Sequence, residues 1–378
     1  MTQDRVCEYA ASVHIARDGD VSMRDQLTVL SPYFANLQNE SRLSAYLASG
    51  ILGSPRIWLL YWEGNPAAHW SSFPFPFWID GRQVIGGKPE LGAVHRNVVY
   101  RFPRPDLFGM IMNEVVSQAR DAGWPLLVTK PNMLSRASLN KRGFQNVAVA
   151  FDETVWLLRP QAFVPRAVEY VHKRYGKLSS VIPSPVLNGA IRCALHAMAT
   201  ITAMRTTLVP SAYELIDLPL DDLRQYSDLL ETNYWPHCRL TVWREPDFLQ
   251  NRLRAASGYQ VLGVWSRRQR KVIALAIIYC SDEGISLLDV LPPAMCLEKE
   301  FWAELIRFAI RSGASALKAR LYLNNPFHAA VANQSWIKIG SRRVRCKDVF
   351  VALALDSKYN FAYDPNVWAG TDMLYATF

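Results

Sequence analysis

The side chains best suited to chemistry lie between residues 90 and 135. Glu90 and His95 carry a carboxylate and an imidazole, which can accept a proton, and they lie on or just before the strand that leads to residues 104–109. That segment, RPDLFG, opens a helix, and the N-terminus of a helix offers unpaired N–H groups to an anion such as a pyrophosphate. These residue types therefore allow proton transfer and anion binding within one segment.

Each of these side chains also has an ordinary structural interpretation. Glu90 follows Gly86-Gly87-Lys88-Pro89 and could be a solvated turn residue, while His95 suits the face of a strand or a hairpin. Asp106 suits the N-cap of the helix, but its carboxylate would repel a pyrophosphate.

The stretch TKPNMLSRASLNKRGF, residues 129–144, combines two kinds of signal. Asn132 and Ser135 could contact a ligand, but both residue types are also good helix caps in any protein. Gly143-Phe144 is typical of fold construction, because Gly ends a helix in the left-handed conformation and Phe then fills the core.

The elements that position these residues alternate between helix and strand patterns. Apolar residues at helical spacing predict helices within residues 21–50, and antiparallel strands follow, with turns at Glu63–Pro66 and Asp80-Gly81. Residues 90–102 read as another strand, and residues 104–123 as an amphipathic helix ended by Gly123. A buried strand, a helix and a final strand complete this half at Pro160.

The second half repeats this order, which indicates an internal duplication. It contains a helix, a hairpin with the basic turn Arg267–Lys271, a strand, a second amphipathic helix, a strand, a short helix and a last strand. We therefore predict domains at residues 1–160 and 211–378, joined by a helical linker at residues 161–210.

Composition narrows the class of protein. Half of the 378 residues are hydrophobic and 20% are charged, which excludes a disordered chain. The net charge of +9 suits an anionic partner: a nucleotide-bearing cofactor, RNA or an acidic membrane surface. Six dispersed Cys, without a C-x-x-C pair or His at zinc-site spacing, predict reduced thiols and no metal site. We expect a cytoplasmic protein, because no signal peptide or membrane span is evident.

The repeated order of elements resembles the GNAT acyltransferase superfamily in its tandem two-domain form, of the kind linked to polysaccharide or envelope biosynthesis. The resemblance covers nearly the whole chain in element order and is concentrated in motif between Glu90 and Phe144. It rests on a PN…S…GF segment, a Trp before an Asp-containing tail, and a Trp-Arg element, here Pro131, Asn132, Ser135, Gly143, Phe144, Trp368, Asp372 and LTVWREP at 240–246. It implies an α/β (α+β) fold of two tandem GNAT-like domains, each with a mostly antiparallel mixed sheet flanked by helices.

The resemblance also implies an acetyl-CoA or other acyl-CoA site. GNAT proteins bind the pyrophosphate with an Arg/Gln-x-x-Gly-x-Gly/Ala loop; Arg104 and Gly109 fit this pattern, and Leu107 replaces its first Gly. The residues implied in cofactor binding are Val98, Val99, Arg104, Leu107, Phe108, Gly109, Met110, Asn132 and Ser135.

The implied reaction is direct attack of an amine on the thioester. Glu90 or His95 would take the proton, and backbone N–H groups would polarise the carbonyl. The position of the usual general acid, a Tyr, holds Leu139, and Tyr100 is the nearest alternative. The second domain lacks Gly in its matching loop DVLPPAMCLEKE, so we expect it to form a cleft wall without a cofactor, with candidate residues Trp235, His237, Arg239, Trp243 and Arg244.

These observations lead to three hypotheses. The first is an acyl-CoA-dependent N-acyltransferase that modifies a primary amine of a small molecule, such as an amino sugar or amino acid, with no DNA partner. The second is an aminoacyl-tRNA-dependent transferase, which the positive charge would suit. The third is a non-catalytic module at a membrane surface, with peripheral contact through residues 164–204. Packing of those helices between the domains is the alternative to membrane contact.

Overall fold

The computed structural model describes residues 13–48, 52–101, 106–174, 183–231, 239–244, 246–254, 257–323, 328–333 and 341–368. The first half contains these elements: β1 (Val13–Arg17), η1 (Asp18–Asp20), α2 (Met23–Leu30), α3 (Glu40–Leu47), β2 (Arg56–Trp62), β3 (Asn65–Ile79), β4 (Arg82–Val94), α4 (Arg96–Val99), α5 (Leu107–Asp121), β5 (Leu126–Thr129), α6 (Met133–Asn140) and β6 (Gln145–Leu157). The elements that follow it are η2 (Pro160–Phe163), α7 (Val164–Arg174) and α9 (Ser184–Thr207).

The second half contains these elements: β7 (Tyr213–Leu218), η3 (Leu220–Tyr226), α10 (Ser227–Glu231), β8 (Leu240–Val242), α11 (Pro246–Arg254), β9 (Tyr259–Ser266), β10 (Lys271–Ser281), β11 (Gly284–Leu291), η5 (Pro293–Leu297), α12 (Lys299–Arg311), β12 (Ala316–Tyr322), α13 (His328–Asn333), β13 (Ser341–Ala354), η6 (Ser357–Tyr363) and η7 (Pro365–Val367). The predicted mixed α/β class is confirmed.

The strands form one continuous 13-stranded sheet in the order β1-β2-β3-β4-β5-β13-β6-β12-β11-β10-β9-β7, with β8 paired to β3. Neighbouring strands are antiparallel except for β4 with β5 and β11 with β12. The parallel pair occupies the same place in each half, as the predicted duplication requires.

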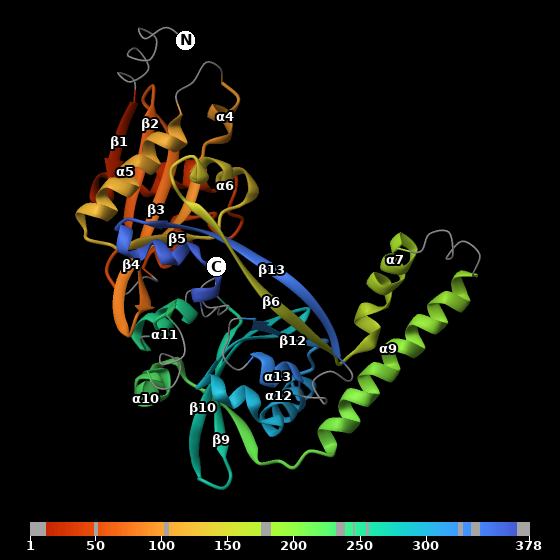
Figure 1. Ribbon diagram of the computed structural model, residues 1–378. Helices are drawn as coiled ribbons and strands as arrows, with labels where there is room; N and C mark the ends of the chain where they lie inside the picture. Colours follow the sequence, from red (N-terminus) through yellow and green to blue (C-terminus); the bar gives the residue numbers. More distant parts are fainter. Residues whose placement is uncertain are drawn as a thin grey trace.

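Each half of the sheet is completed by the last strand of the other half. β13 lies beside β5, whereas β6 lies beside β12, and the two long strands pair with each other from Gln145 to Trp156 (Figure 1). The sequence segments 1–160 and 211–378 therefore each contribute a strand to the sheet built mainly by the other.

Helices cover both faces of the first half of the sheet. α5 packs on one face, where Trp58, Trp70 and Ile111 belong to one apolar core. α2 and α3 cover the other face through a core that includes Leu43 and Phe73. A further core, which contains residues from both halves, fills the space between them.

Local sequence signals explain the tight turns of this half. Glu63-Gly64 and Asp80-Gly81 all have positive φ, the conformation that two-residue hairpin turns need, and both predicted turns are confirmed. β3 continues without a break through Pro66, Pro74 and Pro76. On β3, the pairing with β2 stops at Ser72. Pro74 and Pro76 lie beyond that point, so their missing N–H groups break no hydrogen bond with β2.

The predicted strand at residues 90–102 is wrong in its second part. β4 ends at Val94, and residues 96–99 form the short helix α4. The β-branched residues of this stretch favour a strand, but the backbone N–H of His95 bonds to the Ala67 carbonyl (2.7 Å) and Val98 turns into the α5 core. Tertiary packing therefore overrides the local preference.

The helices α7 and α9 extend away from the sheet as a hairpin (Figure 1). α7 buries none of its residues, and α9 buries only Leu187, Thr202 and Thr206. The hairpin is therefore mostly exposed, and only part of α9 packs between the halves, against β6 of the first and α12 of the second. Among the described helices, none combines the length and the apolar character that a membrane crossing needs.

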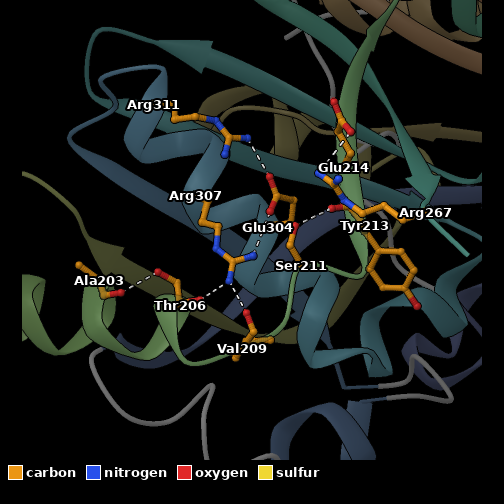
Figure 2. A network of polar contacts seen from close by, with 10 residues as sticks. All are labelled: Ala203, Thr206, Val209, Ser211, Tyr213, Glu214, Arg267, Glu304, Arg307 and Arg311. Carbon is orange, nitrogen blue, oxygen red and sulfur yellow. Dashed lines mark hydrogen bonds and ion pairs between the residues drawn. The ribbon is translucent and has the colours of Figure 1, made fainter.

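The base of α9 is fixed by one arginine. Arg307 of α12 donates hydrogen bonds to the carbonyls of Thr206 and Val209, and Glu304 holds the same guanidinium at 3.0 Å (Figure 2). Because the last carbonyls of a helix lack partners within it, this contact caps the C-terminal end of α9.

Residues 239–254 connect the two halves, since β8 pairs with β3 and Arg252 forms an ion pair with Glu90. The same segment is also fixed within the second half. In β11, Asp289 is buried and its Oδ2 accepts a hydrogen bond from Arg244 Nε at 2.8 Å. Arg244 is fully buried and also donates to the Val242 carbonyl at 2.7 Å.

We expect Arg244→Met to lower the free energy of unfolding by roughly 3–5 kcal/mol, because Asp289 would remain buried without its partner. Arg224→Met, which breaks the exposed ion pair with Asp247, is the matched control and should cost little. Urea unfolding measures both, and equal losses would contradict the role given to Arg244.

Candidate functional site

The parallel strands β4 and β5 diverge beside the helix α5. They pair at one position, Gly87 opposite Leu127, after which β4 continues to Val94 and β5 ends at Thr129. A Cβ at Gly87 would lie 2.4 Å from Leu127 Cδ2, so glycine is what lets β5 approach. Beyond this point the β5-facing edge of β4 has no strand partner in the described part of the chain. Its backbone groups can therefore bind a ligand.

A β-bulge follows Glu90 on β4. The register with β3 shifts between His69 and Ser71, and Leu91 has a φ of 50°. Ser71 Oγ donates to the Glu90 carbonyl (3.1 Å), and His69 Nδ1 donates to the Leu91 carbonyl (2.9 Å). Two buried polar side chains thus hold the carbonyls of the irregular segment, which fixes the conformation of the diverging strand.

Glu90 is the centre of a buried cluster of charges. Lys88 Nζ lies 2.6 Å and Arg252 Nη2 lies 3.0 Å from its Oε1, while the Tyr46 hydroxyl donates to its Oε2. All four side chains are buried, and they come from β4, α3 and, for Arg252, α11 of the second half. The cluster therefore joins the divergence of β4 and β5 to the second half of the chain.

The electrostatics of the cluster keep Glu90 ionised. Burial alone would raise its pKa, but Arg252 and Lys88 outweigh burial and lower the pKa to about 2. Burial lowers the pKa of Lys88 to about 8, although Glu90 opposes that shift. Burial, reinforced by Glu90, raises the pKa of Tyr46 well above its usual value. Glu90 is therefore not a solvated turn residue, which was the structural alternative for it. Its role in proton transfer stays a prediction.

His95 and Tyr100 flank the short helix α4 at the end of β4. His95 is half-buried at the N-cap of α4, and its side chain makes no capping hydrogen bond. Tyr100 is 78% exposed at the C-cap. Tyr33 also reaches this end of the strand, since its hydroxyl donates to the Val94 carbonyl at 2.8 Å.

The N-terminus of α5 carries an internal anion. Asp106 is the N-cap, and its Oδ1 accepts a hydrogen bond from Gly109 N at 3.0 Å. Arg142, directly after α6, forms an ion pair with the same carboxylate and donates to the Ser138 carbonyl. A Cβ at Gly109 would lie 1.6 Å from Arg142 Nη2, so glycine makes room for this pair. The helix end therefore already binds a carboxylate and a guanidinium.

The other residues predicted to bind a cofactor lie around this helix end. Val98 and Leu107 are buried in the core beneath α5, and Phe108 packs edge-on against Trp70 (5.0 Å between ring centroids). Val99 and Met110 are half-buried on α4 and α5. Arg104 lies outside the described residues.

Asn132 and Ser135 act as helix caps in this structure. Asn132 Oδ1 accepts hydrogen bonds from Ser135 N (2.8 Å) and Ser135 Oγ (2.9 Å) at the start of α6. Gly143 has a φ of 85° and Phe144 is buried in the α5 core, which confirms their predicted structural roles. Leu139 is buried in the same core.

The residues proposed for the wall of the second domain serve structural contacts where they are described. Trp243 stacks on Trp78 of β3 (4.9 Å between ring centroids), and Arg239 Nε pairs with Asp80 at 2.8 Å. Trp235 and His237 lie outside the described residues.

Four site residues were missed by the sequence interpretation: Tyr46, Lys88, Arg142 and Arg252. Lys88 had a usable signal, because residues 88 and 90 of a strand project to the same face. Arg142 and Arg252 had none, since they are far from their carboxylate partners in the sequence and only the fold brings them together.

We expect acid to destabilise the protein through His69. Burial lowers the pKa of His69 to about 4, so the unfolded chain binds more protons as the pH falls from about 6.5 to 4. The free energy of unfolding should drop by roughly 2 kcal/mol between about pH 7 and pH 5 through this group. Urea unfolding of His69→Gln should show a smaller drop; an unchanged pH dependence would contradict this assignment.

Comparisons with known proteins agree with this geometry. No protein-family model and no curated protein matches the sequence. Solved structures do match. A GCN5-related N-acetyltransferase from Kribbella flavida is 14% identical, with a TM-score of 0.57, over 94% of this chain and 74% of that protein. One from Anabaena variabilis is 11% identical, with a TM-score of 0.58, over 91% and 73%. Saccharomyces cerevisiae N-myristoyltransferase with bound myristoyl-CoA is 11% identical, with a TM-score of 0.51, over 91% and 83%. The chain therefore has the fold of the GCN5-related N-acetyltransferases.

Proposed function

We propose that the protein is an acyl-CoA-dependent N-acyltransferase that acylates a primary amine of a small molecule, such as an amino sugar or amino acid. The observation that carries the proposal is the divergence of β4 and β5 next to the N-terminus of α5. A free strand edge suits the amide chain of pantetheine, and a helix N-terminus suits a pyrophosphate. The similar structures supply the class of reaction, because they include N-acetyltransferases and an N-myristoyltransferase holding myristoyl-CoA.

The chemistry of the α5 N-terminus fits a phosphate group. Phosphate oxygens need backbone N–H donors and a guanidinium, which are the two kinds of donor that Asp106 now uses through Gly109 and Arg142. Asp106 is 67% exposed, whereas Arg142 is 15% exposed. The carboxylate can therefore swing into solvent while Arg142 stays, and a pyrophosphate would take its place.

The residues of the chain divide the remaining tasks. The free edge of β4 beyond the bulge would bind the donor and direct N–H groups at the thioester carbonyl, which becomes more electrophilic. We assign the removal of the ammonium proton to His95, because it lies at the end of that edge and is half-buried. Glu90, with a pKa of about 2 and two cationic partners, is a weak base, so we assign it the positioning of β4.

An aminoacyl-tRNA-dependent transferase is the second candidate. Arg343, Arg345 and Lys347 are exposed at alternate positions of β13, so they form a basic row that could bind a phosphate backbone. Asp152 pairs with both arginines and neutralises part of the row, which is why we place this candidate second. Salt-sensitive binding of tRNA, without binding of acyl-CoA, would favour it.

Acyl-CoA binding at the N-terminus of α5 can be tested by substitution of Asp106, the carboxylate that now occupies this helix end, and of its partner Arg142. We expect at least one acyl-CoA, among chain lengths from acetyl to myristoyl, to raise the melting temperature of the protein. Asp106→Ser keeps a helix cap but removes the negative charge that repels the pyrophosphate. The dissociation constant of the acyl-CoA should therefore fall about threefold or more. Arg142→Gln should raise it roughly tenfold.

Arg120→Gln, at the opposite end of α5, is the matched control and should leave acyl-CoA binding unchanged. Calorimetry or thermal shift gives the constants. Absence of binding by every acyl-CoA, or equal binding by all three variants, would contradict the proposed site.

The assignment of proton removal to His95 predicts that a substitution there lowers turnover without changing the affinity for the acyl-CoA. His95→Gln should lower kcat by roughly a hundredfold or more, because general base catalysis contributes about that much. The dissociation constant of the acyl-CoA should stay the same. Steady-state kinetics together with calorimetry measure both, and full activity of the variant would transfer the role to another group.

A further inference from the structure

The helix α9 exposes a continuous apolar stripe along its whole length. Residues that share this stripe recur every three or four positions, are all exposed, and include no charged side chain: Val186, Ala190, Cys193, Ala194, Ala197, Ile201, Met204 and Leu208, the last at the C-cap. At about 100° per residue they span roughly one third of the helix circumference. Met204 is 62% exposed and Leu208 is 82% exposed. A surface helix normally turns such a stripe toward a core.

The other side of α9 already has a partner. Leu187, Thr202 and Thr206 are its buried residues. At about 100° per residue, Thr202 and Thr206 lie on the side away from the stripe, and Leu187 lies at its border. Contacts of α9 are with α7, η2, β6 and α12. Arg307 fixes its C-terminal end (Figure 2), and Arg166 of α7 pairs with Glu283 at 2.7 Å. The hairpin is therefore held at its base, and the stripe remains uncovered in the described part of the chain.

The charge of the hairpin sequence indicates what kind of surface would cover the stripe. Residues 164–208 contain six Lys and Arg and a single acidic residue, Glu169. α9 itself has no Asp or Glu. His172, Lys173 and Arg174 form the last turn of α7, near the start of α9 along the hairpin. An occupant must therefore combine apolar contact with negative charge.

We propose that the α7–α9 hairpin docks on an anionic lipid surface, with α9 lying in the plane of the interface and its stripe in contact with the acyl chains. An apolar stripe on a helical hairpin that carries an excess of cations is the pattern of segments that lie at a membrane interface. α9 does not meet the requirements for crossing the membrane. A second copy of this chain would bring two cationic hairpins together, and RNA would supply charge without apolar surface.

Vesicle co-sedimentation of the full chain tests the proposal. We expect binding to vesicles of phosphatidylcholine with phosphatidylglycerol, little binding to phosphatidylcholine alone, and weaker binding as salt is added. Ile201→Glu should weaken binding at least roughly tenfold, because it places a charge in the stripe. Reversal of charge by Lys173→Glu with Arg174→Glu should weaken it through loss of attraction to the headgroups.

Ile310→Glu in α12 is the matched control, because Ile201 and Ile310 are both helical isoleucines with 41% exposure. It should bind vesicles like the unmodified protein, and circular dichroism should show that all variants fold. No binding to anionic vesicles, or equal binding by Ile201→Glu and Ile310→Glu, would overturn the proposal. So would self-association in sedimentation equilibrium that Ile201→Glu abolishes without any vesicle binding, since the occupant would then be a second copy.

Discussion

This structure depends on two buried ion pairs, one for each half. In each of them, a carboxylate that follows the parallel strand pairing is matched by an arginine, and both arginines come from one connecting segment. Glu90 on β4 pairs with Arg252, and Asp289 on β11 pairs with Arg244. Both arginines come from residues 244–252, and both carboxylates lie beside a shift of strand register. Because a charge buried without its partner is strongly destabilising, neither half can keep its geometry if this segment moves away. The exchange of β6 and β13 adds a backbone connection to this electrostatic one.

The same constraint shapes the candidate site. Glu90 holds β4 at the point where it parts from β5, and His69 and Ser71 fix the bulge that follows. The strand edge is therefore rigid before any ligand arrives, which reduces the ordering cost of binding. The N-terminus of α5 is prepared in a different way. There Asp106 occupies the position of an anion, so in the proposed site a ligand phosphate would have to displace a carboxylate that already binds Gly109 and Arg142. In the proposed site, the affinity for the acyl-CoA would depend on that competition.

Much of the fold could be predicted from the sequence, because periodicity and turn chemistry are local. The turns at Glu63-Gly64 and Asp80-Gly81, the amphipathic helix α5 and the duplicated order of elements all follow from short patterns. The sequence failed where distant contacts decide the outcome. α4 forms because Val98 joins the α5 core, and β13 completes the sheet of the other half. Glu90 and His95 could be singled out, but Arg142 and Arg252 could not, since no local pattern links an arginine to a carboxylate that folding alone brings close.

Hydrogen–deuterium exchange of the full chain, with and without acetyl-CoA or a longer acyl-CoA, tests the central claim most directly. The claim is that the free edge of β4 and the first turn of α5 form the donor site. Amide exchange should slow at residues 88–94 and 107–110 when the acyl-CoA binds, because ligand contacts satisfy and shield those N–H groups. Binding that leaves both segments unchanged, while other amides become protected, would show that the donor site lies elsewhere in the molecule.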